Sequence, residues 1–211
     1  MIHEGEKDNR FYSHDLPSTP MDAAFIEAEK DKIKVAMVGL CGCWGCHLSF
    51  LDMDEAILDV LSKCTINRSS FTDLKRIPER TTVGFVEGGV SNEETIQQLI
   101  EFRENCDILI SVGACAVWGG VPAMRNMVPL EECFDVAYFD SCTKVDGAKP
   151  VVPNGPEIPF INTKVLPCHE VVKMDYFIPG CPPDGAAILK VLDDLINGRE
   201  VDLPKSINRY D

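Results

Sequence analysis

The fold is indicated most clearly by residues 33–46, which read IKVAMVGLCGCWGC. The first part, Ile33 to Gly39, is a mostly apolar run of the kind found in strands that are buried on both faces of a sheet. A C-x-x-C pair, Cys43 and Cys46, follows a few residues after the run ends. An apolar strand that leads into a cysteine-bearing loop is therefore the first structural unit of this chain.

The same unit recurs further along the chain. The apolar run 107–112 precedes Cys115, and the run 174–178 precedes Cys181 within a Pro-Gly-Cys-Pro-Pro segment. A further strand is predicted over 82–86, before the segment Glu-Gly-Gly-Val that begins at Glu87, and a weaker one over 64–68. Parallel strands deliver the loops that follow them to one edge of the sheet. We therefore expect the cysteine loops to meet there.

Helices are predicted between these strands. The periodicity of residues 50–62 indicates a helix, and a second one is expected to begin at Ser91, with Glu94 completing a capping box. Asp184 is predicted to cap a last helix that ends before Gly198. The alternation predicts an α/β fold: an open parallel sheet flanked by helices, flavodoxin-like, with its site at the C-terminal edge of the strands.

The chain is predicted to have three parts. Residues 1–32 form an N-terminal extension, residues 33–198 form the flavodoxin-like domain, and residues 199–211 form a C-terminal tail. Within the domain, five prolines between residues 144 and 167 argue against a helix or a central strand, so this segment is expected to be an irregular excursion.

Composition limits the function classes. The 211 residues carry 34 acidic and 20 basic side chains, a formal charge of −14. Nucleic acid and anionic membrane surfaces would repel such a chain. No secretion signal and no apolar stretch of about 20 residues is visible, so a cytoplasmic location is expected. The ten cysteines should then stay reduced, which favours metal binding or redox chemistry over disulfides.

Four cysteines are the candidate ligands of one metal centre: Cys43, Cys46, Cys115 and Cys181. Glycines beside them relieve the steric limits on tight loops and expose amide groups that can hydrogen-bond to a cluster. The residues expected to border the ligands are Cys41, Gly42, Trp44, Gly45, Gly113, Cys168 and Gly180.

Several alternatives stay open at this point. The C-x-x-C pair is compatible with a thioredoxin-like dithiol, and four thiols are compatible with a structural zinc ion. Cys41 could replace Cys43 as a ligand, and Cys168 could compete with Cys181. His47 and His169 are expected to be hydrogen-bonding groups. Glu87 is either a surface carboxylate or a proton relay. The remaining cysteines are expected to be small apolar core residues: Cys64, Cys106, Cys133 and Cys142.

Taken in order, these motifs resemble a known family. The C-x-x-C loop, Glu-Gly-Gly-Val, Gly-Ala-Cys-Ala and Pro-Gly-Cys-Pro-Pro-Asp are similar to the motifs of the small subunit of nickel-iron hydrogenases. More distantly, they resemble the cluster-bearing subunit of respiratory NADH dehydrogenase. The resemblance covers approximately residues 33–198, and the stretches 43–54, 103–127 and 171–184 look most like the small subunit of the soluble, cytoplasmic, NAD-reducing type.

The resemblance implies a cofactor and partners. It implies a single 4Fe-4S cluster held by the four cysteines named above, because after Gly198 only a short polar tail remains and no second cysteine group follows. It implies a large subunit that carries the nickel-iron centre, and diaphorase subunits that carry FMN and iron-sulfur clusters. No residue of this chain is then catalytic, apart from the relay role considered for Glu87. An FMN beside the sheet, and an acceptor other than NAD, stay open.

One position departs from the family pattern. Uptake-type relatives have an acidic residue two positions after the second cysteine of the C-x-x-C motif, and here that residue is Leu48. A proton path through this position is therefore in doubt.

Overall fold

The computed structural model describes residues 32–72, 77, 80–145, 147, 149 and 151–208. The chain divides into two units, residues 1–32 and 33–211. The predicted N-terminal extension lies outside the described residues except for Lys32. All of the described helices and strands belong to the second unit.

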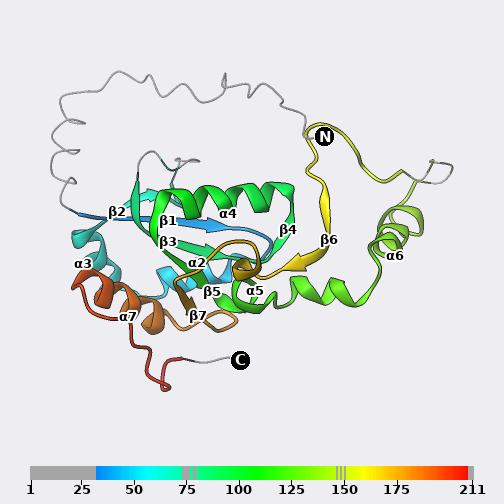
Figure 1. Ribbon diagram of the computed structural model, residues 1–211. Coiled ribbons are helices and arrows are strands. Elements are labelled where there is room, and N and C mark those ends of the chain that lie inside the picture. Colours follow the sequence, from blue (N-terminus) through cyan, green and yellow to red (C-terminus); the bar gives the residue numbers. More distant parts are fainter. Residues whose placement is uncertain are drawn as a thin grey trace. The chain divides into compact units, whose positions relative to one another are not determined.

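A five-stranded parallel sheet forms the centre of this unit (Figure 1). Its strands are β1 (Ile33–Gly39), β2 (Cys64–Arg68), β3 (Thr81–Glu87), β5 (Cys106–Val112) and β7 (Tyr176–Ile178). Their order across the sheet is β2-β1-β3-β5-β7, and every neighbouring pair is parallel. This is the flavodoxin-like order, so the predicted fold class is confirmed.

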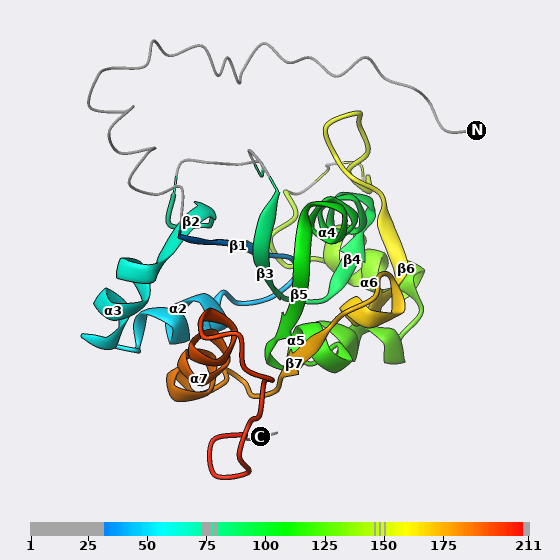
Figure 2. The same ribbon diagram turned by 60° about the vertical axis from the view of Figure 1, so that its left-hand side comes forward.

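Helices cover both faces of the sheet (Figure 2). Helix α4 (Glu93–Asn105) lies on one face, and α2 (Gly45–Leu51), α3 (Ala56–Lys63) and α7 (Gly185–Ile196) lie on the other. Alternate side chains of β1 enter the two resulting cores. Val35 and Met37 lie in the core cluster that includes Ile188 of α7, whereas Ala36 lies in the cluster that includes Leu99 of α4. Both faces of the strand are buried, which explains why its sequence is a nearly continuous apolar run.

The single helix predicted over 50–62 is wrong, because the structure has two helices there. Helix α2 begins earlier, at Gly45, and ends at Leu51, and α3 begins at Ala56. Between them Asp54 has a left-handed backbone with φ of 49°. The first turn of α7 presses on this break, since a Cβ on Gly185 would lie 2.9 Å from the carbonyl oxygen of Ser49. Helical periodicity alone does not reveal such a tertiary contact.

The start of α4 differs by one residue from the prediction. Asn92 is the N-cap, and its side chain accepts a hydrogen bond from the backbone N–H of Thr95 at 2.8 Å. The hydroxyl of Thr95 in turn accepts from the Asn92 backbone N–H at 3.1 Å. Ser91 lies one residue before the N-cap, in strand β4 (Val90–Asn92), and its backbone N–H also donates to the Thr95 hydroxyl at 3.1 Å.

Strand β4 pairs with a strand that was not predicted. Its antiparallel partner β6 (Ile161–Leu166) lies within the segment expected to be irregular, so that expectation is wrong for its last part. The strand lies between Pro159 and Pro167 and contains no proline itself. The pair of strands β4 and β6, called here the β4–β6 ribbon, is separate from the main sheet. The structure therefore agrees with the expectation that this segment contains no strand of the central sheet.

Five short helices and turns connect the strands and helices described above. They are α5 (Gly113–Trp118), the 3-10 helix η2 (Pro122–Met127), α6 (Leu130–Phe134), the π-helical turn η3 (Asp135–Phe139) and the 3-10 turn η4 (Cys168–Glu170). The last helix agrees with its prediction: Asp184 caps it by accepting from the Ala186 N–H at 2.9 Å, and it ends before Gly198. None of the helices in the described ranges has the length and apolar character needed to cross a bilayer.

The carboxyl ends of four strands lie in one row. Gly39 of β1 is in register with Glu87 of β3, and Glu87 is in register with Val112 of β5. Val112 is in turn in register with Ile178 of β7. The loops that follow these four residues therefore leave the sheet at one level. The order of the strands also reverses between β1 and β3, where open α/β sheets bind their ligands.

Candidate metal centre

The C-x-x-C loop is held to the neighbouring strand by its own backbone. Beyond the end of β1, Cys41 and Gly89 exchange two backbone hydrogen bonds, of 3.0 and 2.8 Å. Gly88 beside it has φ of +87°, and a Cβ there would lie 2.9 Å from backbone atoms of Cys41. The double glycine of the Glu-Gly-Gly-Val segment is the sequence signal for this close approach, although the sequence alone did not identify its partner.

The pair Cys43 and Cys46 lies at the start of α2. Trp44 between them has a left-handed backbone, with φ of 66°, and its carbonyl accepts the first hydrogen bond of the helix from Leu48. Cys43 is exposed, whereas Cys46 is partly buried and packs against the core cluster below α2. The turn thus presents one thiol at the surface and the other toward the interior.

The loops of Cys115 and Cys181 are joined to each other. The backbone N–H of Ala114, one residue before Cys115, donates to the carbonyl of Gly180, one residue before Cys181, at 2.7 Å. Both loops depend on glycine, since φ is +83° at Gly113 and +132° at Gly180. The two cysteine loops predicted from separate strands therefore lie side by side.

Glycines also bring the first loop against the other two. A Cβ on Gly113 would collide with the Sγ atom of Cys46. A Cβ on Gly45 would lie 3.3 Å from the Sγ of Cys43 and 3.7 Å from the Cβ of Pro182. These contacts link all three cysteine-bearing loops, as expected from their positions after the strands.

The pKa values of two of the thiols are raised by burial and by the charges of the neighbouring cysteines. Burial raises the pKa of Cys46, and the charges of Glu87, Cys115 and Cys43 raise it further. Burial also raises the pKa of Cys115, with contributions from Cys181 and Cys43. Each of the four candidate cysteines thus acts on another one. The four thiols would bind a metal centre as thiolates, and the iron ions of an iron-sulfur cluster would supply the positive charge that offsets them.

Four thiols are also the donor set of a structural zinc ion. Across the described ranges, no group of three or more His, Cys, Asp or Glu side chains is arranged to hold one metal ion. A structural zinc site brings four donor atoms to within about 2.0–2.3 Å of one point. The donor set of four thiols and the close approach of glycine backbone fit an iron-sulfur cluster.

Glu87 is buried rather than at the surface, with 4% of its area exposed. Its Oε2 accepts from the backbone N–H of His47 at 2.8 Å. The Nδ1 atom of His47 lies 3.0 Å from the same oxygen, but at an angle that does not make a hydrogen bond. The carboxylate also contacts Cys46 through a hydrogen bond. The surface-carboxylate interpretation is therefore wrong, and Glu87 lies against one of the candidate ligands.

The two cysteines expected to border the site have different environments. Cys41 is partly buried and forms the bridge to Gly89. Cys168 is fully buried, its Sγ donates to the carbonyl of Gly88 at 3.5 Å, and burial raises its pKa to about 12. His169 is exposed and packs edge-on against Phe177, with ring centroids 5.9 Å apart.

The remaining cysteines agree only partly with their expected role as core residues. Cys64 and Cys106 are buried, and burial raises the pKa of Cys106 to about 12. Cys133 is partly buried, and Cys142 is exposed, so the expectation is wrong for Cys142. The polar residues around it, Asp140, Ser141, Thr143 and Lys144, are the sequence signal for this exposure.

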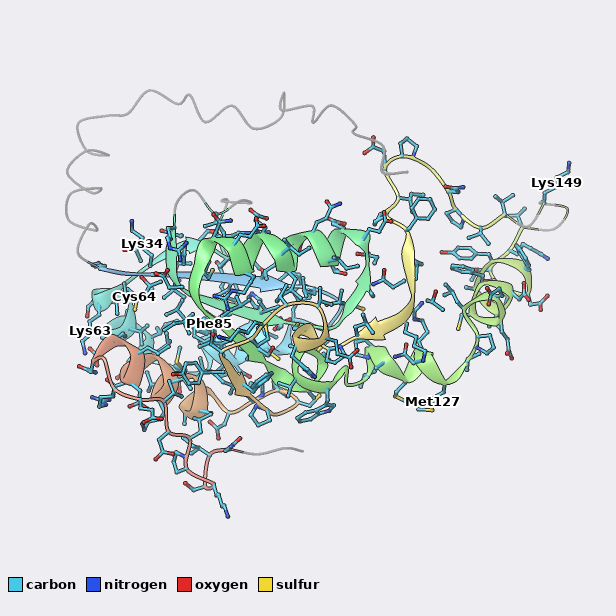
Figure 3. All side chains as sticks on the ribbon, in the orientation of Figure 1. Lys34, Lys63, Cys64, Phe85, Met127 and Lys149 are labelled. Carbon is cyan, nitrogen blue, oxygen red and sulfur yellow. The ribbon has the colours of Figure 1, made fainter. Side chains whose placement is uncertain are left out.

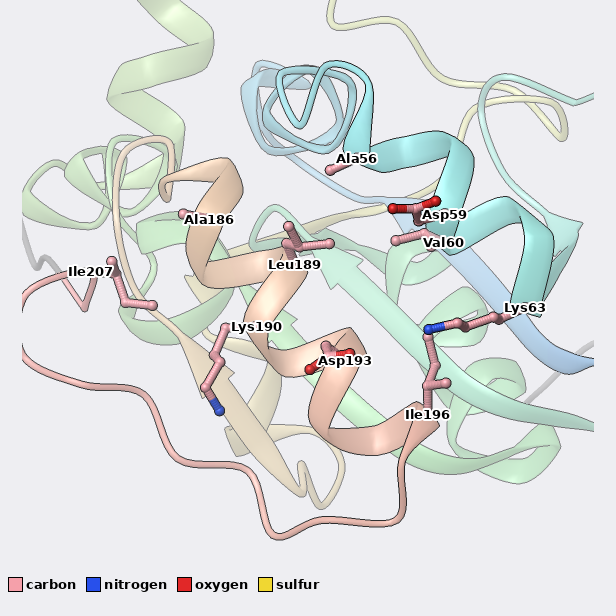
Figure 4. Close-up of a pocket in the computed structure, with 10 residues that line it drawn as sticks. All are labelled: Ala56, Asp59, Val60, Lys63, Ala186, Leu189, Lys190, Asp193, Ile196 and Ile207. Atoms are coloured by element: carbon pink, nitrogen blue, oxygen red, sulfur yellow. The ribbon is translucent and has the colours of Figure 1, made fainter.

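Two of the cavities in the described part of the chain have none of the four candidate ligands in their walls. One, of about 460 Å³, lies between α3 and α7 and is closed on one side by Ile207 (Figure 4). None of the candidate ligands lines it. The other, of about 390 Å³, lies at the carboxyl end of β1, where Trp44, Arg68, Ser69 and Ser70 line it. The guanidinium of Arg68 is paired with Glu101 at 3.1 Å.

Comparison with known proteins agrees with this geometry. The sequence model of the family described as NADH ubiquinone oxidoreductase, 20 Kd subunit, matches residues 43–195. This match includes the four candidate ligands and all three of their loops.

Individual relatives extend the similarity over the chain. The NAD-reducing hydrogenase HoxS subunit delta of Cupriavidus necator is 71% identical over 199 residues, which cover 94% of this chain and 95% of the relative. The iron-sulfur subunit of the F420-non-reducing hydrogenase of Archaeoglobus profundus is 30% identical over 182 residues, covering 79% of this chain and 56% of the relative. The chain therefore spans just over half of that archaeal protein.

A solved structure shares the fold. A chain in the crystal structure of an NAD+-reducing NiFe-hydrogenase in the H2-reduced state superposes with a TM-score of 0.82 and 40% sequence identity. The match covers 85% of this chain and 99% of that one.

Proposed function

The chain belongs to the family of the 20 Kd subunit of NADH ubiquinone oxidoreductase, as the small subunit of an NAD-reducing nickel-iron hydrogenase, and we propose that it relays electrons there through one 4Fe-4S cluster. The cluster would be held by Cys43, Cys46, Cys115 and Cys181. The observation that best supports this proposal is the register of the strand ends, from Gly39 to Ile178, which sends the three cysteine loops to one edge.

The protein residues have defined tasks in this proposal. The four thiolates bind the cluster, and the glycines beside them allow the loop backbone to approach it. When bound, the cluster accepts and donates single electrons. The partial burial of Cys46 excludes water from that side of the site. We retain Glu87 as the candidate proton relay, now with the specific placement between Cys46 and His47.

The partners follow from the same proposal. A large subunit carrying the nickel-iron centre would split hydrogen, and diaphorase subunits carrying FMN and further clusters would reduce NAD. The cytoplasmic location expected from the sequence stays a prediction.

Serine variants test the proposal directly. In the complete enzyme, Cys115→Ser and Cys181→Ser should abolish or convert the cluster, because a serine oxygen replaces a thiolate ligand. Hydrogen-driven NAD reduction should fall, whereas NADH-driven dye reduction by the diaphorase should persist. Cys142→Ser is the matched control, because Cys142 is exposed and is not a candidate ligand. Full hydrogen-to-NAD turnover in both ligand variants would reject the proposal.

Metal analysis separates the alternatives. The chain purified without oxygen should contain about four iron and four sulfide per molecule and absorb in the visible range. A colourless protein with one zinc ion, or with a reversible dithiol and no metal, would support the alternative zinc-binding or thiol-disulfide module instead.

FMN binding would use a different place. The cavity at the carboxyl end of β1 lies at the switch point of the sheet, and Trp44 offers an aromatic face there. The phosphate would need Arg68 to be released from Glu101. Flavin released from the denatured chain, measured by fluorescence, tests this part of the proposal, and its absence would confine FMN to the diaphorase.

A further inference from the structure

A buried carboxylate lies against both ends of the C-x-x-C loop. The Oε2 atom of Glu87 accepts from the backbone N–H of His47 at 2.8 Å. Its Oε1 atom faces the other end of the loop, since a Cβ on Gly42 would lie 3.9 Å from it. The carboxylate is therefore held between the residue before Cys43 and the residue after Cys46.

The end of strand β3 fixes the position of this side chain. The backbone carbonyl of Glu87 accepts from the N–H of Leu40 at 2.8 Å, which joins it to the chain just beyond β1. Side chains two residues apart in a strand point to the same face of the sheet. Phe85 is therefore on the same face as Glu87; it is 2% exposed, and Figure 3 shows it in the interior of the domain. Glu87 thus extends toward the core that α2 and α7 cover, and not toward solvent.

The surroundings of the carboxylate are mostly apolar. A small cavity is lined by Glu87, Cys46 and His47 together with five apolar side chains: Met37, Phe50, Phe85, Val112 and Ile188. Its volume is about 10 Å³, which leaves room for about one water molecule at most. In the described part of the chain, no Lys or Arg forms an ion pair with Glu87. The charge of this carboxylate is therefore screened only weakly by water, salt or a cation.

A weakly screened charge at this place acts on the electron affinity of the site. The reduction potential of an iron-sulfur cluster depends on net charge, hydrogen bonds and solvent exposure. One-electron reduction adds a negative charge to the cluster, and a fixed negative charge beside a ligand repels it. A carboxylate held against the C-x-x-C loop therefore favours the oxidised form.

We propose that the charge of Glu87 lowers the reduction potential of the cluster, and that the backbone N–H of His47 holds the carboxylate in the position where it does so. This inference rests on the proposed function, because it requires a cluster on the four cysteines. It assigns Glu87 a task that is separate from a proton relay. A low potential suits a carrier between hydrogen and NAD, because hydrogen and NADH are both strong reductants.

The test is a redox titration of the full-length chain with its cluster, followed by visible absorbance and electron paramagnetic resonance. Glu87→Gln removes the charge and keeps an oxygen that can accept from the His47 N–H. At a fixed potential, the ratio of reduced to oxidised cluster should rise about tenfold, which is about 59 mV for a one-electron couple. Asp52→Asn is the matched control, because it removes the same charge from the exposed C-cap of α2. Its ratio should stay within about twofold of wild type.

A second variant keeps the test decisive if Glu87→Gln loses its iron. Glu87→Asp retains the charge but draws it back from the loop by one methylene, so the ratio should rise about threefold. An unchanged or lower ratio in a variant with full iron content overturns the proposal, even if its thermal midpoint changes, because Glu87 would then be only structural. Loss of the cluster in both variants overturns it as well. Absence of iron from the wild-type chain would instead contradict the proposed function.

Discussion

The contact between Gly113 and Cys46 gives a sharp prediction for cluster binding. In Gly113→Ala, the new Cβ would collide with the Cys46 Sγ atom, and the residue would have to keep φ of +83°. A left-handed backbone costs an L-residue about 1–2 kcal/mol, partly offset by about 0.4–1 kcal/mol from the lower entropy of the unfolded chain. The steric collision comes in addition and acts directly on a candidate ligand.

A matched control separates the two effects. Gly198 also has a left-handed backbone, with φ of +65°, but a Cβ there would meet no atom within 4 Å. Gly198→Ala should therefore lose only backbone free energy, with a fall in the melting temperature of about 2–8 °C at most for a chain of this size. Gly155→Ala, with neither a positive φ nor a close neighbour, should be neutral or slightly stabilising.

The assay is iron per chain after anaerobic purification, together with thermal unfolding of each variant. Gly113→Ala should lose most of its iron, because Cys46 cannot keep its position, whereas Gly198→Ala and Gly155→Ala should retain it. Full iron content in Gly113→Ala, with stability equal to that of Gly198→Ala, would refute the inference that the Cys115 loop approaches Cys46 this closely.

Two predictions concern the scaffold. Burial raises the pKa of Asp175, but hydrogen bonds from Arg103 and from the backbone N–H of Leu109 outweigh it, so the folded pKa lies below the ordinary value. The ionised carboxylate therefore stabilises the fold above about pH 4, and this stabilisation is lost as the pH falls further. In Asp175→Asn, the free energy of unfolding should fall less steeply between about pH 4 and lower pH than it does in the wild type. An unchanged fall would show that Asp175 does not contribute to the acid sensitivity of the fold. Asn92→Ala should reduce the free energy of unfolding in urea by about 1 kcal/mol, and Ser91→Ala should cost less; the reverse order would restore Ser91 as the N-cap.

Much of the architecture was predictable because it depends on local patterns. The apolar runs at 33–39 and 107–112 required burial on both faces, which is satisfied only inside a helix-covered parallel sheet. Asp184 and Gly198 marked the ends of the last helix through capping preferences that act within a few residues.

Two of the errors share one cause, which is contact between distant segments. Gly185 of α7 packs against residues on the α2 side of the break, and strand β6 is paired with β4. The shift of the N-cap to Asn92 is local instead, since it follows from the two hydrogen bonds between Asn92 and Thr95. Propensity does not contain information on such partners.

For the site, the candidate cysteine ligands came from the residues and from family resemblance, since thiols after parallel strands can meet only at one edge. Their actual juxtaposition depended on the register of four strand ends and on the bond between Ala114 and Gly180. The burial of Glu87 and its position against both ends of the C-x-x-C loop appeared only in the tertiary structure. Burial and hydrogen-bond satisfaction are properties of the packed chain, because each depends on atoms supplied by residues far away in the sequence.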